Sequence, residues 1–142
     1  YPKADIPVLQ LSLDITKNLE EHFNLGKTLL ELRKEGVLII GSGDIVHNLS
    51  SLAGEQYSNS IFNWAEAFDK QVKTDFISKN FEKMIDYKYR NKNFAEMSVP
   101  TLEHYLPILY IAGLVQSEDN VNFFHESIQH GSISMSSCII SQ

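Results

Sequence analysis

The sequence predicts an α/β fold with a central, mostly parallel or mixed sheet and helices on both faces. Two apolar segments carry this prediction. A partly alternating segment at 6–13 precedes a helical pattern that runs to Lys34, and four consecutive apolar residues follow at 37–40. The second segment is typical of a strand buried on both faces, as in a parallel sheet covered by helices. Strand, helix and strand at this spacing predict a βαβ unit.

The helix of this unit has recognisable start and stop signals. Thr16 or Asn18 can cap its N-terminus, and acidic residues follow in the first turn, where the helix dipole favours them. Leucines recur at helical spacing as far as Lys34. Gly36 is well placed to end the helix. The strand before it, 6–13, has a proline only at its entry, where a strand tolerates one.

The middle of the chain is predicted to be helical. Large apolar residues recur every three or four positions over 64–76, and the pattern continues or restarts at 81–85. The polar and basic stretch 88–93 predicts a loop. A further helix is predicted to start at Pro100 and to run through Tyr110.

The last third of the chain ends in predicted strands. Two apolar runs, 121–124 and 133–140, have strand character. The total of 142 residues fits one domain. Because the chain enters strand-like sequence within its first residues and has no charged leader, we expect residues 1–142 to be the C-terminal portion of a longer domain.

Charge and composition exclude several classes of partner. The chain carries 12 basic and 18 acidic residues, a formal net charge of −6, which disfavours a nucleic-acid partner. The richest apolar stretch, 105–115, contains a proline and is shorter than the about 20 residues of a membrane helix. The single cysteine, Cys138, excludes an internal disulfide and suits a reducing compartment, so a cytoplasmic location is expected.

A glycine-rich turn follows the predicted strand 37–40. Gly41-Ser42-Gly43 begins like the dinucleotide-binding motif G-x-G-x-x-G, but the last position of the motif is His47. The glycines are therefore interpreted as a tight turn that presents a side chain. Ligands of open α/β sheets bind beyond the carboxyl ends of strands, which is where His47 is predicted to lie.

Two of the five histidines are candidate metal ligands. His47 follows a strand end and His104 lies near the start of a predicted helix, so the two imidazoles can converge on a metal. Two ligands are too few for a stable site, and a buried structural histidine is the alternative for each. His22 is interpreted as structural. His125 and His130 flank a loop, where they either line a pocket or lie on the surface.

Several segments of the chain resemble one enzyme family. The segment 41–49, GSGDIVHNL, resembles G-S-G-x-x-x-H-N-L of the class III extradiol ring-cleavage dioxygenases, in particular the 4,5-DOPA dioxygenase branch. The segment 100–107, PTLEHYLP, resembles P-T-P-E-H-Y-L-P of that branch. Residues 4–12, the helix around Trp64 and residues 131–135 are also similar, in the same order and spacing. The family has a proline where this chain has Leu102, and an early helical position tolerates either residue.

The resemblance implies a non-haem metal site. It makes His104 a metal ligand, and it places His47 there as a further ligand or as the acid/base. The expected cofactor is Fe(II) for activity, with Zn(II) able to occupy the same site. Glu103 is an alternative carboxylate ligand to His104. The two are not expected to ligate together, because consecutive helical residues point about 100° apart. The family has a further N-terminal part with two more metal-binding histidines, which lies outside this chain.

The resemblance also implies a reaction, opening of a catechol ring next to the diol with O₂. A histidine beside the metal can take and return a proton in this chemistry. Asn48, Tyr105, His125 and His130 are candidate substrate-binding residues; their structural alternatives are loop hydrogen bonding, packing and, for both histidines, solvent exposure.

Two other hypotheses stand beside the enzyme. The scaffold can serve as a non-enzymatic metal-binding or interaction protein, because fold does not fix function. Residues 1–142 alone are expected to be catalytically inactive. They are also expected to form a homo-oligomer, since the apolar run at 37–40 lacks neighbouring strands.

Overall fold

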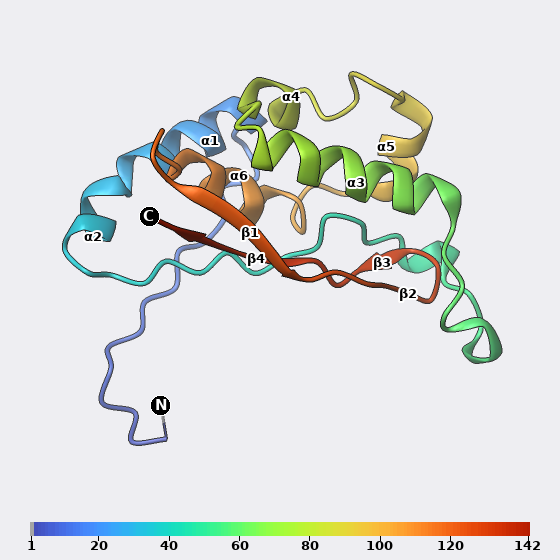
Figure 1. Ribbon diagram of the computed structural model, residues 1–142, viewed down its shortest axis with the longest axis horizontal. Coiled ribbons are helices and arrows are strands. Elements are labelled where there is room, and N and C mark those ends of the chain that lie inside the picture. Colours follow the sequence, from blue (N-terminus) through green and yellow to red (C-terminus); the bar gives the residue numbers. More distant parts are fainter. Residues whose placement is uncertain (1) are drawn as a thin grey trace.

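The computed structural model describes residues 2–142 as a layer of helices packed on short strands (Figure 1). The helices are α1 (Leu19–Thr28), α2 (Leu30–Lys34), α3 (Asn63–Ile77), α4 (Phe81–Ile85), α5 (Lys92–Ser98) and α6 (Leu106–Gly113), with the 3₁₀ turns η1 (Leu49–Ser51) and η2 (Glu55–Tyr57). The strands are β1 (Asn120–His125), β2 (Ile128–Gln129), β3 (Ile133–Ser134) and β4 (Ser137–Ser141).

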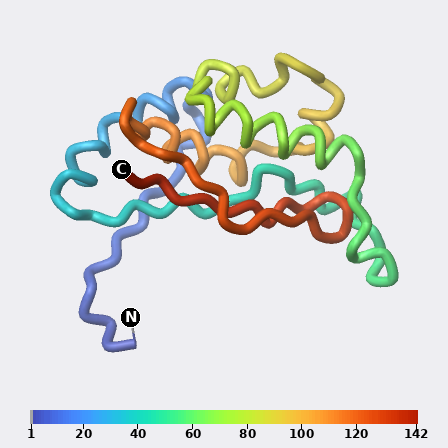
Figure 2. Tube along the Cα trace, viewed as in Figure 1, coloured from blue at the N-terminus to red at the C-terminus, as the bar shows by residue number. Residues whose placement is uncertain are grey.

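The helices other than α2 lie together on one side of the strands. In this layer α1 packs along α6, and α3 packs against α5 and α4. Figure 2 shows the N-terminal segment leaving this body as an extended tail. The combination of helices and strands confirms the α/β class. The sheets within residues 2–142 are small and antiparallel, however, and do not form the predicted central, mostly parallel or mixed sheet with helices on both faces.

The paired strands are antiparallel within residues 2–142. β1 pairs with β4 in a register that joins Val121 to Ile140, and β2 pairs with β3. The predicted strand 133–140 is present but interrupted, because its residues divide between β3 and β4. A single antiparallel bridge joins His47 to Ile133, and this contact brings the segment after 37–40 to the edge of the hairpin.

Two predicted strands are extended but unpaired. Residues 6–13 and 37–40 have no strand assignment, and Leu9, Leu38 and Ile40 are 97%, 73% and 77% exposed. A strand requires a hydrogen-bonded neighbour, and residues 2–142 place none beside these segments. The apolar pattern predicts a paired strand for each of the two segments. The structure has extended backbone in both, but no strand pairing within residues 2–142.

The helix predicted to run to Lys34 is correctly capped but divided. Asn18 accepts a hydrogen bond from the Glu21 amide in a reciprocal capping box. The break falls at Leu29, because the Thr28 hydroxyl donates to the Leu25 carbonyl and the Leu29 amide turns to Gly26. Gly36, with φ +84°, follows the end of α2 in the left-handed conformation.

Two further helix boundaries differ from the prediction. The helix predicted from Pro100 begins only at Leu106, with Pro107 in its first turn; an earlier start would make the Pro107 ring clash with the carbonyl of residue 103. The sequence does not predict α5, because the polar stretch 88–93, which predicts a loop, overlaps the start of this helix. It forms because Asn91 caps it and Ala95 is buried in the core.

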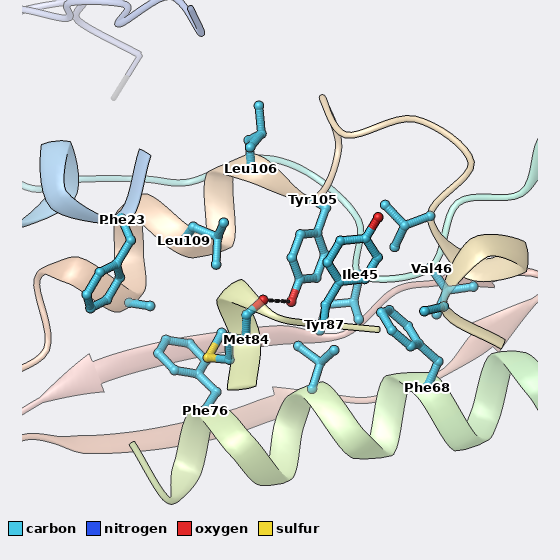
Figure 3. Packing of buried hydrophobic residues seen from close by; sticks show 14 of the residues in the cluster. Phe23, Ile45, Val46, Phe68, Phe76, Met84, Tyr87, Tyr105, Leu106 and Leu109 are labelled. Atoms are coloured by element: carbon cyan, nitrogen blue, oxygen red, sulfur yellow. Dashed lines mark hydrogen bonds between the residues drawn. The ribbon is translucent and has the colours of Figure 1, made fainter. Parts of the chain in front are cut away.

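The core lies between the helix layer and the strands (Figure 3). Phe68 and Phe76 from α3 belong to the same core cluster as Met84 of α4 and Leu109 of α6, and all four side chains are at most 1% exposed. Each such side chain contributes about 1.5–3 kcal/mol through removal from water. The same core contacts Ile45 and Val46, so it fixes the chain just before His47. None of the helices within residues 2–142 has the length and apolar character that a membrane crossing requires.

Candidate active site

The two motif segments around His47 and His104 lie side by side. The His47 amide donates to the Ser98 carbonyl at 3.0 Å, and the Asp44 amide donates to the His104 carbonyl at 2.9 Å. These backbone hydrogen bonds join 44–47 to the end of α5 and to the turn that precedes α6. The two segments therefore meet in space although α3, α4 and α5 separate them in the sequence.

Gly43 permits this close approach. A Cβ atom at this position would overlap the carbonyl oxygen of His104 and would lie 3.1 Å from the Pro107 ring. Backbone atoms cannot move aside as a flexible side chain can. The glycine-rich turn is therefore explained by packing against the His104 turn rather than by a nucleotide.

The β2–β3 hairpin holds the opposite side of the His47 segment. The Ser134 amide donates to the Val46 carbonyl, and the Asn48 amide donates to the Ser132 carbonyl. The Ser134 hydroxyl also donates to buried Asp69 of α3 at 2.5 Å, and Lys73 pairs with the other oxygen of that carboxylate. His47 thus sits on backbone that is fixed from two sides.

The imidazoles of His47 and His104 form a tilted pair. Their ring centroids are 4.9 Å apart with an interplanar angle of 40°. His47 is buried, with 5% of its surface exposed, whereas His104 is exposed. The structure therefore brings together the two histidines that the sequence singled out.

Both ring nitrogens of His47 face backbone carbonyls. Nε2 lies 2.8 Å from the Thr101 oxygen, and Nδ1 lies 3.2 Å from the Asp44 oxygen. A carbonyl only accepts hydrogen bonds, and a neutral imidazole has one N–H. The neutral ring can therefore satisfy one of these contacts, while a protonated ring can satisfy both.

Asp44 completes the polar group around the two rings. Burial raises the pKa of its half-buried carboxyl group, and the nearby His104 and His47 oppose that shift. Asp44 lies within the motif, but it is not among the site residues that the sequence predicts. The available signal was a carboxylate three positions before the candidate histidine, in the same turn.

A largely apolar cavity opens beside this polar group. Its volume is about 530 Å³, and its lining includes Asp44, His104 and Arg33. Its apolar walls come from the extended residues 37–40, from α6 and from the β1–β4 pair.

Asn48 and Tyr105 use their polar groups within the protein. The Asn48 side chain donates to the Met97 carbonyl at 2.7 Å. Tyr105 is fully buried, and its hydroxyl donates to the Met84 carbonyl at 2.9 Å (Figure 3). Tyr105 therefore has no exposed atom to offer a substrate, in agreement with its packing alternative.

The remaining histidines lie apart from the pair. His125 is exposed at the end of β1, with Nε2 3.3 Å from the Ser127 hydroxyl. His130 is half-buried at the β2–β3 turn, with Nδ1 3.3 Å from the Ala53 carbonyl. His22 is fully buried, and its Nδ1 lies 2.9 Å from the Tyr110 hydroxyl.

The residues around the pair supply part of a metal site. His104 offers an exposed imidazole, but no group of three or more His, Cys, Asp or Glu side chains within 2–142 is arranged to hold a metal ion. Glu103 accepts from the Thr101 hydroxyl at 2.7 Å, which lowers the pKa of its carboxyl group. Glu103 and His104 lie in a turn and not in a helix, so the angle of about 100° between consecutive helical residues does not apply to them.

Fold and site together define an α/β protein whose motif histidines form one centre beside an apolar cavity. The chain belongs to the family described as the catalytic LigB subunit of aromatic ring-opening dioxygenase, which matches residues 1–140.

Named relatives agree with this membership. The chain is 38% identical over 136 residues to a 4,5-DOPA dioxygenase extradiol of Escherichia coli K12, a match that covers 95% of this chain and 50% of the relative. It is 34% identical over 137 residues to the protein of that name from Beta vulgaris, covering 96% of this chain and 50% of the relative. The chain thus spans about half the length of these curated relatives.

A solved structure shares the fold. The crystal structure of an uncharacterized protein from Escherichia coli K12 superimposes with a TM-score of 0.88 at 36% sequence identity. The match covers 97% of this chain and 57% of that one.

Proposed function

We propose that the protein containing this chain is a non-haem metal-dependent extradiol dioxygenase that opens the ring of a catechol with O₂. One observation carries the proposal: two motif histidines, remote in sequence, form a ring pair 4.9 Å apart beside a cavity. The relatives named as DOPA dioxygenases support the reaction class. The substrate is accordingly a DOPA-like catechol.

His104 is the proposed metal ligand of this chain. His104 is exposed and lines the cavity, and its backbone carbonyl accepts a hydrogen bond from the Asp44 amide. The described residues lack a complete ligand set, so the other ligands come from outside residues 2–142. A bound Fe(II) would supply electron transfer between catechol and O₂, and Zn(II) is its redox-inert substitute.

His47 is the proposed acid/base. Its two carbonyl contacts fix the ring in place and leave room for one additional hydrogen bond when the ring gains a proton. A histidine held in this way can accept a catechol proton and return it later. Metal ligation at His47 would require one nitrogen to leave its carbonyl, and so would proton exchange with a catechol.

The proposed substrate contacts divide by position. Asn48 anchors the loop after His47, and His125 and His130 lie on or near the surface of the hairpin. These three remain proposed contacts of a substrate or of the loops that cover it. For Tyr105 the fully buried ring supports an indirect role, through the packing of the His104 turn.

The test is oxygen uptake by the full-length protein, reconstituted anaerobically with Fe(II) and offered a panel of catechols that includes DOPA. We expect stoichiometric uptake and a new yellow ring-opened product. His104→Ala is expected to lose both bound metal and activity. His47→Ala is expected to keep the metal and lose about 10²–10⁴-fold in kcat, the range of acid–base catalysis.

The possible outcomes separate the roles of the two histidines. Loss of metal in His47→Ala would make His47 a ligand. Full activity in both folded variants would contradict the proposal. A protein that binds metal but consumes no oxygen would favour the non-enzymatic metal-binding protein.

A further inference from the structure

A buried carboxylate on α3 joins that helix to the β2–β3 hairpin. Asp69 is 4% exposed, and its Oδ1 accepts hydrogen bonds from the hydroxyls of Ser134 at 2.5 Å and Ser136 at 3.0 Å. Its Oδ2 lies 2.6 Å from the ammonium nitrogen of Lys73, one turn further along the same helix. A buried carboxylate is costly unless it is both paired and hydrogen-bonded, and this one is both. Asp69 is therefore a built junction between α3 and the hairpin.

The lysine and the serines of this junction supply different things. The Lys73 ammonium group also lies 2.5 Å from a carboxylate oxygen of Glu126. Burial opposes the charged form of Lys73, but its hydrogen bonds to Asp69 and Glu126 outweigh burial and raise the pKa of the ammonium group. The charge of Asp69 is thus balanced by a residue of its own helix. The serine hydroxyls are neutral, so their hydrogen bonds tie the carboxylate to a second element instead.

The hairpin also holds the segment that carries His47. The Ser134 amide donates to the carbonyl of Val46 at 2.9 Å, just before His47. The Asn48 amide, just after it, donates to the Ser132 carbonyl at 3.1 Å. Each strand of this hairpin has two residues, and a short isolated hairpin is at best marginally stable in water unless it packs against a helix. Ser134 provides that link, because its hydroxyl bonds to α3 while its amide bonds to the His47 segment.

We propose that Asp69 is a positioning residue for ring opening: through Ser134 it fixes the hairpin that keeps the His47 imidazole in place beside His104. The inference rests on the proposed function and adds a residue to it. The two ring centroids are 4.9 Å apart, and a displacement of about 1 Å at a reacting group can lower turnover about 100-fold. Loss of the serine bond therefore lowers kcat, whereas loss of the lysine contact lowers stability alone.

The experiment compares three variants of the full-length protein. Asp69→Ala removes both sides of the junction, and Ser134→Ala is the milder change that removes one hydroxyl. Lys73→Met is the matched control, because it breaks the ion pair with Asp69 and leaves the serine bonds in place. The measurements are kcat and KM with Fe(II), the content of bound metal, Tm, and hydrogen exchange of the backbone amides of 44–48 in the Zn(II)-loaded protein.

We expect kcat to fall about 10- to 100-fold in Asp69→Ala and about three- to tenfold in Ser134→Ala, with KM and metal content within about twofold of the unaltered protein. Lys73→Met should keep kcat within about twofold although its Tm falls, because a buried carboxylate loses its cation. Exchange at 44–48 should accelerate about tenfold in Asp69→Ala, while α1 keeps its ordinary rate, since local opening is independent of global unfolding.

Three results would overturn the inference. An equal loss of kcat in Lys73→Met and Asp69→Ala would give Asp69 a general stabilising role. Unchanged exchange at 44–48 in Asp69→Ala would show that the carboxylate does not hold the His47 segment. A higher KM or a lower metal content at constant kcat would assign Asp69 to substrate or metal binding. If the unaltered protein turns over no catechol, the proposed function fails, while hydrogen exchange still decides whether Asp69 holds this segment.

Discussion

Gly43 and His104 show how much the candidate site depends on single atoms. The hydrogen of Gly43 faces the carbonyl oxygen of His104, and the neighbouring Asp44 amide bonds to that same oxygen. A methyl group at Gly43 would have to displace the turn that carries the exposed imidazole. Backbone packing therefore sets the distance between the imidazole rings of His47 and His104. A shift of the backbone alone would disrupt the site.

Gly43→Ala is expected to destabilise the full-length protein by about 1–3 kcal/mol through overpacking. Ring-opening activity should fall at least tenfold as His104 shifts. The control is Gly54→Ala, since a Cβ at Gly54 meets no atom within 4 Å. Thermal unfolding and oxygen uptake check both variants. Equal behaviour of the two would show that the 43–104 contact does not position the site.

Individual site residues were predictable to different degrees. His47 and His104 could be selected because their types and neighbouring residues form motifs. Asp44 could not, because its half-buried position beside both imidazoles depends on contacts between distant segments. Tyr105 looked like a pocket residue in its motif, yet its ring is buried and bonds to Met84.

An ion pair joins α2 to the segment that leads into β1. Arg33 contacts both oxygens of Asp119, whose side chain is fully buried, and it also donates to the Leu114 carbonyl. The Gln116 amide donates to the same carboxylate. These contacts, chiefly the hydrogen bond from Arg33, lower the pKa of Asp119. The short helix α2 is therefore held by this pair despite having no buried residue of its own.

Asp119→Asn is expected to lower the free energy of unfolding by about 2–4 kcal/mol at pH 7, as for a broken buried pair. The folded pKa of Asp119 is depressed, so its contribution is complete above the ordinary carboxyl pKa of about 4 and is lost as the pH falls through the folded value. The difference in Tm between the two proteins should therefore shrink below about pH 4.

The control for this pair is Glu31→Gln, which breaks an exposed pair with Lys34 on the same helix. Its effect should be below about 1 kcal/mol, as is usual for surface pairs. A Tm difference for Asp119→Asn that stays constant with pH would assign the loss to packing instead of charge.

Elements with local signals were predicted well, and those with long-range requirements were not. Asn18 and Gly36 mark the helical region between them because a cap and a left-handed residue act locally. The segments 6–13 and 37–40 have strand composition, but pairing depends on a neighbour that composition does not supply. The sequence does not predict α5, because the burial of this helix against α3 is a tertiary contact.

At the scale of the whole molecule, large apolar side chains are exposed on the two extended segments 6–13 and 37–40. Val8, Leu9, Leu38 and Ile40 are each more than 70% exposed, and they lie on the two extended segments. Unpaired strand backbone and apolar side chains on the same segment promote association. The chain spans about half the length of the curated relatives that it matches.

Residues 1–142 expressed alone are therefore expected to self-associate at micromolar concentration in sedimentation velocity experiments. Leu38→Ser combined with Ile40→Ser should reduce the associated fraction severalfold, because both side chains are largely exposed on one segment. Tyr57→Ser is the control, since Tyr57 is 59% exposed on η2, away from those segments. A monomer that is active in ring opening would contradict both this expectation and the inactivity of the isolated chain.

The sequence by itself determined the α/β class, most helical segments, the two terminal strands and the identity of the paired histidines. Each of these follows from a local pattern or from a motif, and both can be recognised without knowledge of the fold. Only the tertiary structure decided that 41–48 lies against the His104 turn, that Tyr105 belongs to the core and that Asp44 lies beside both imidazoles. These are relations between distant segments, and they arise from close packing and backbone hydrogen bonds, which no single stretch of sequence contains.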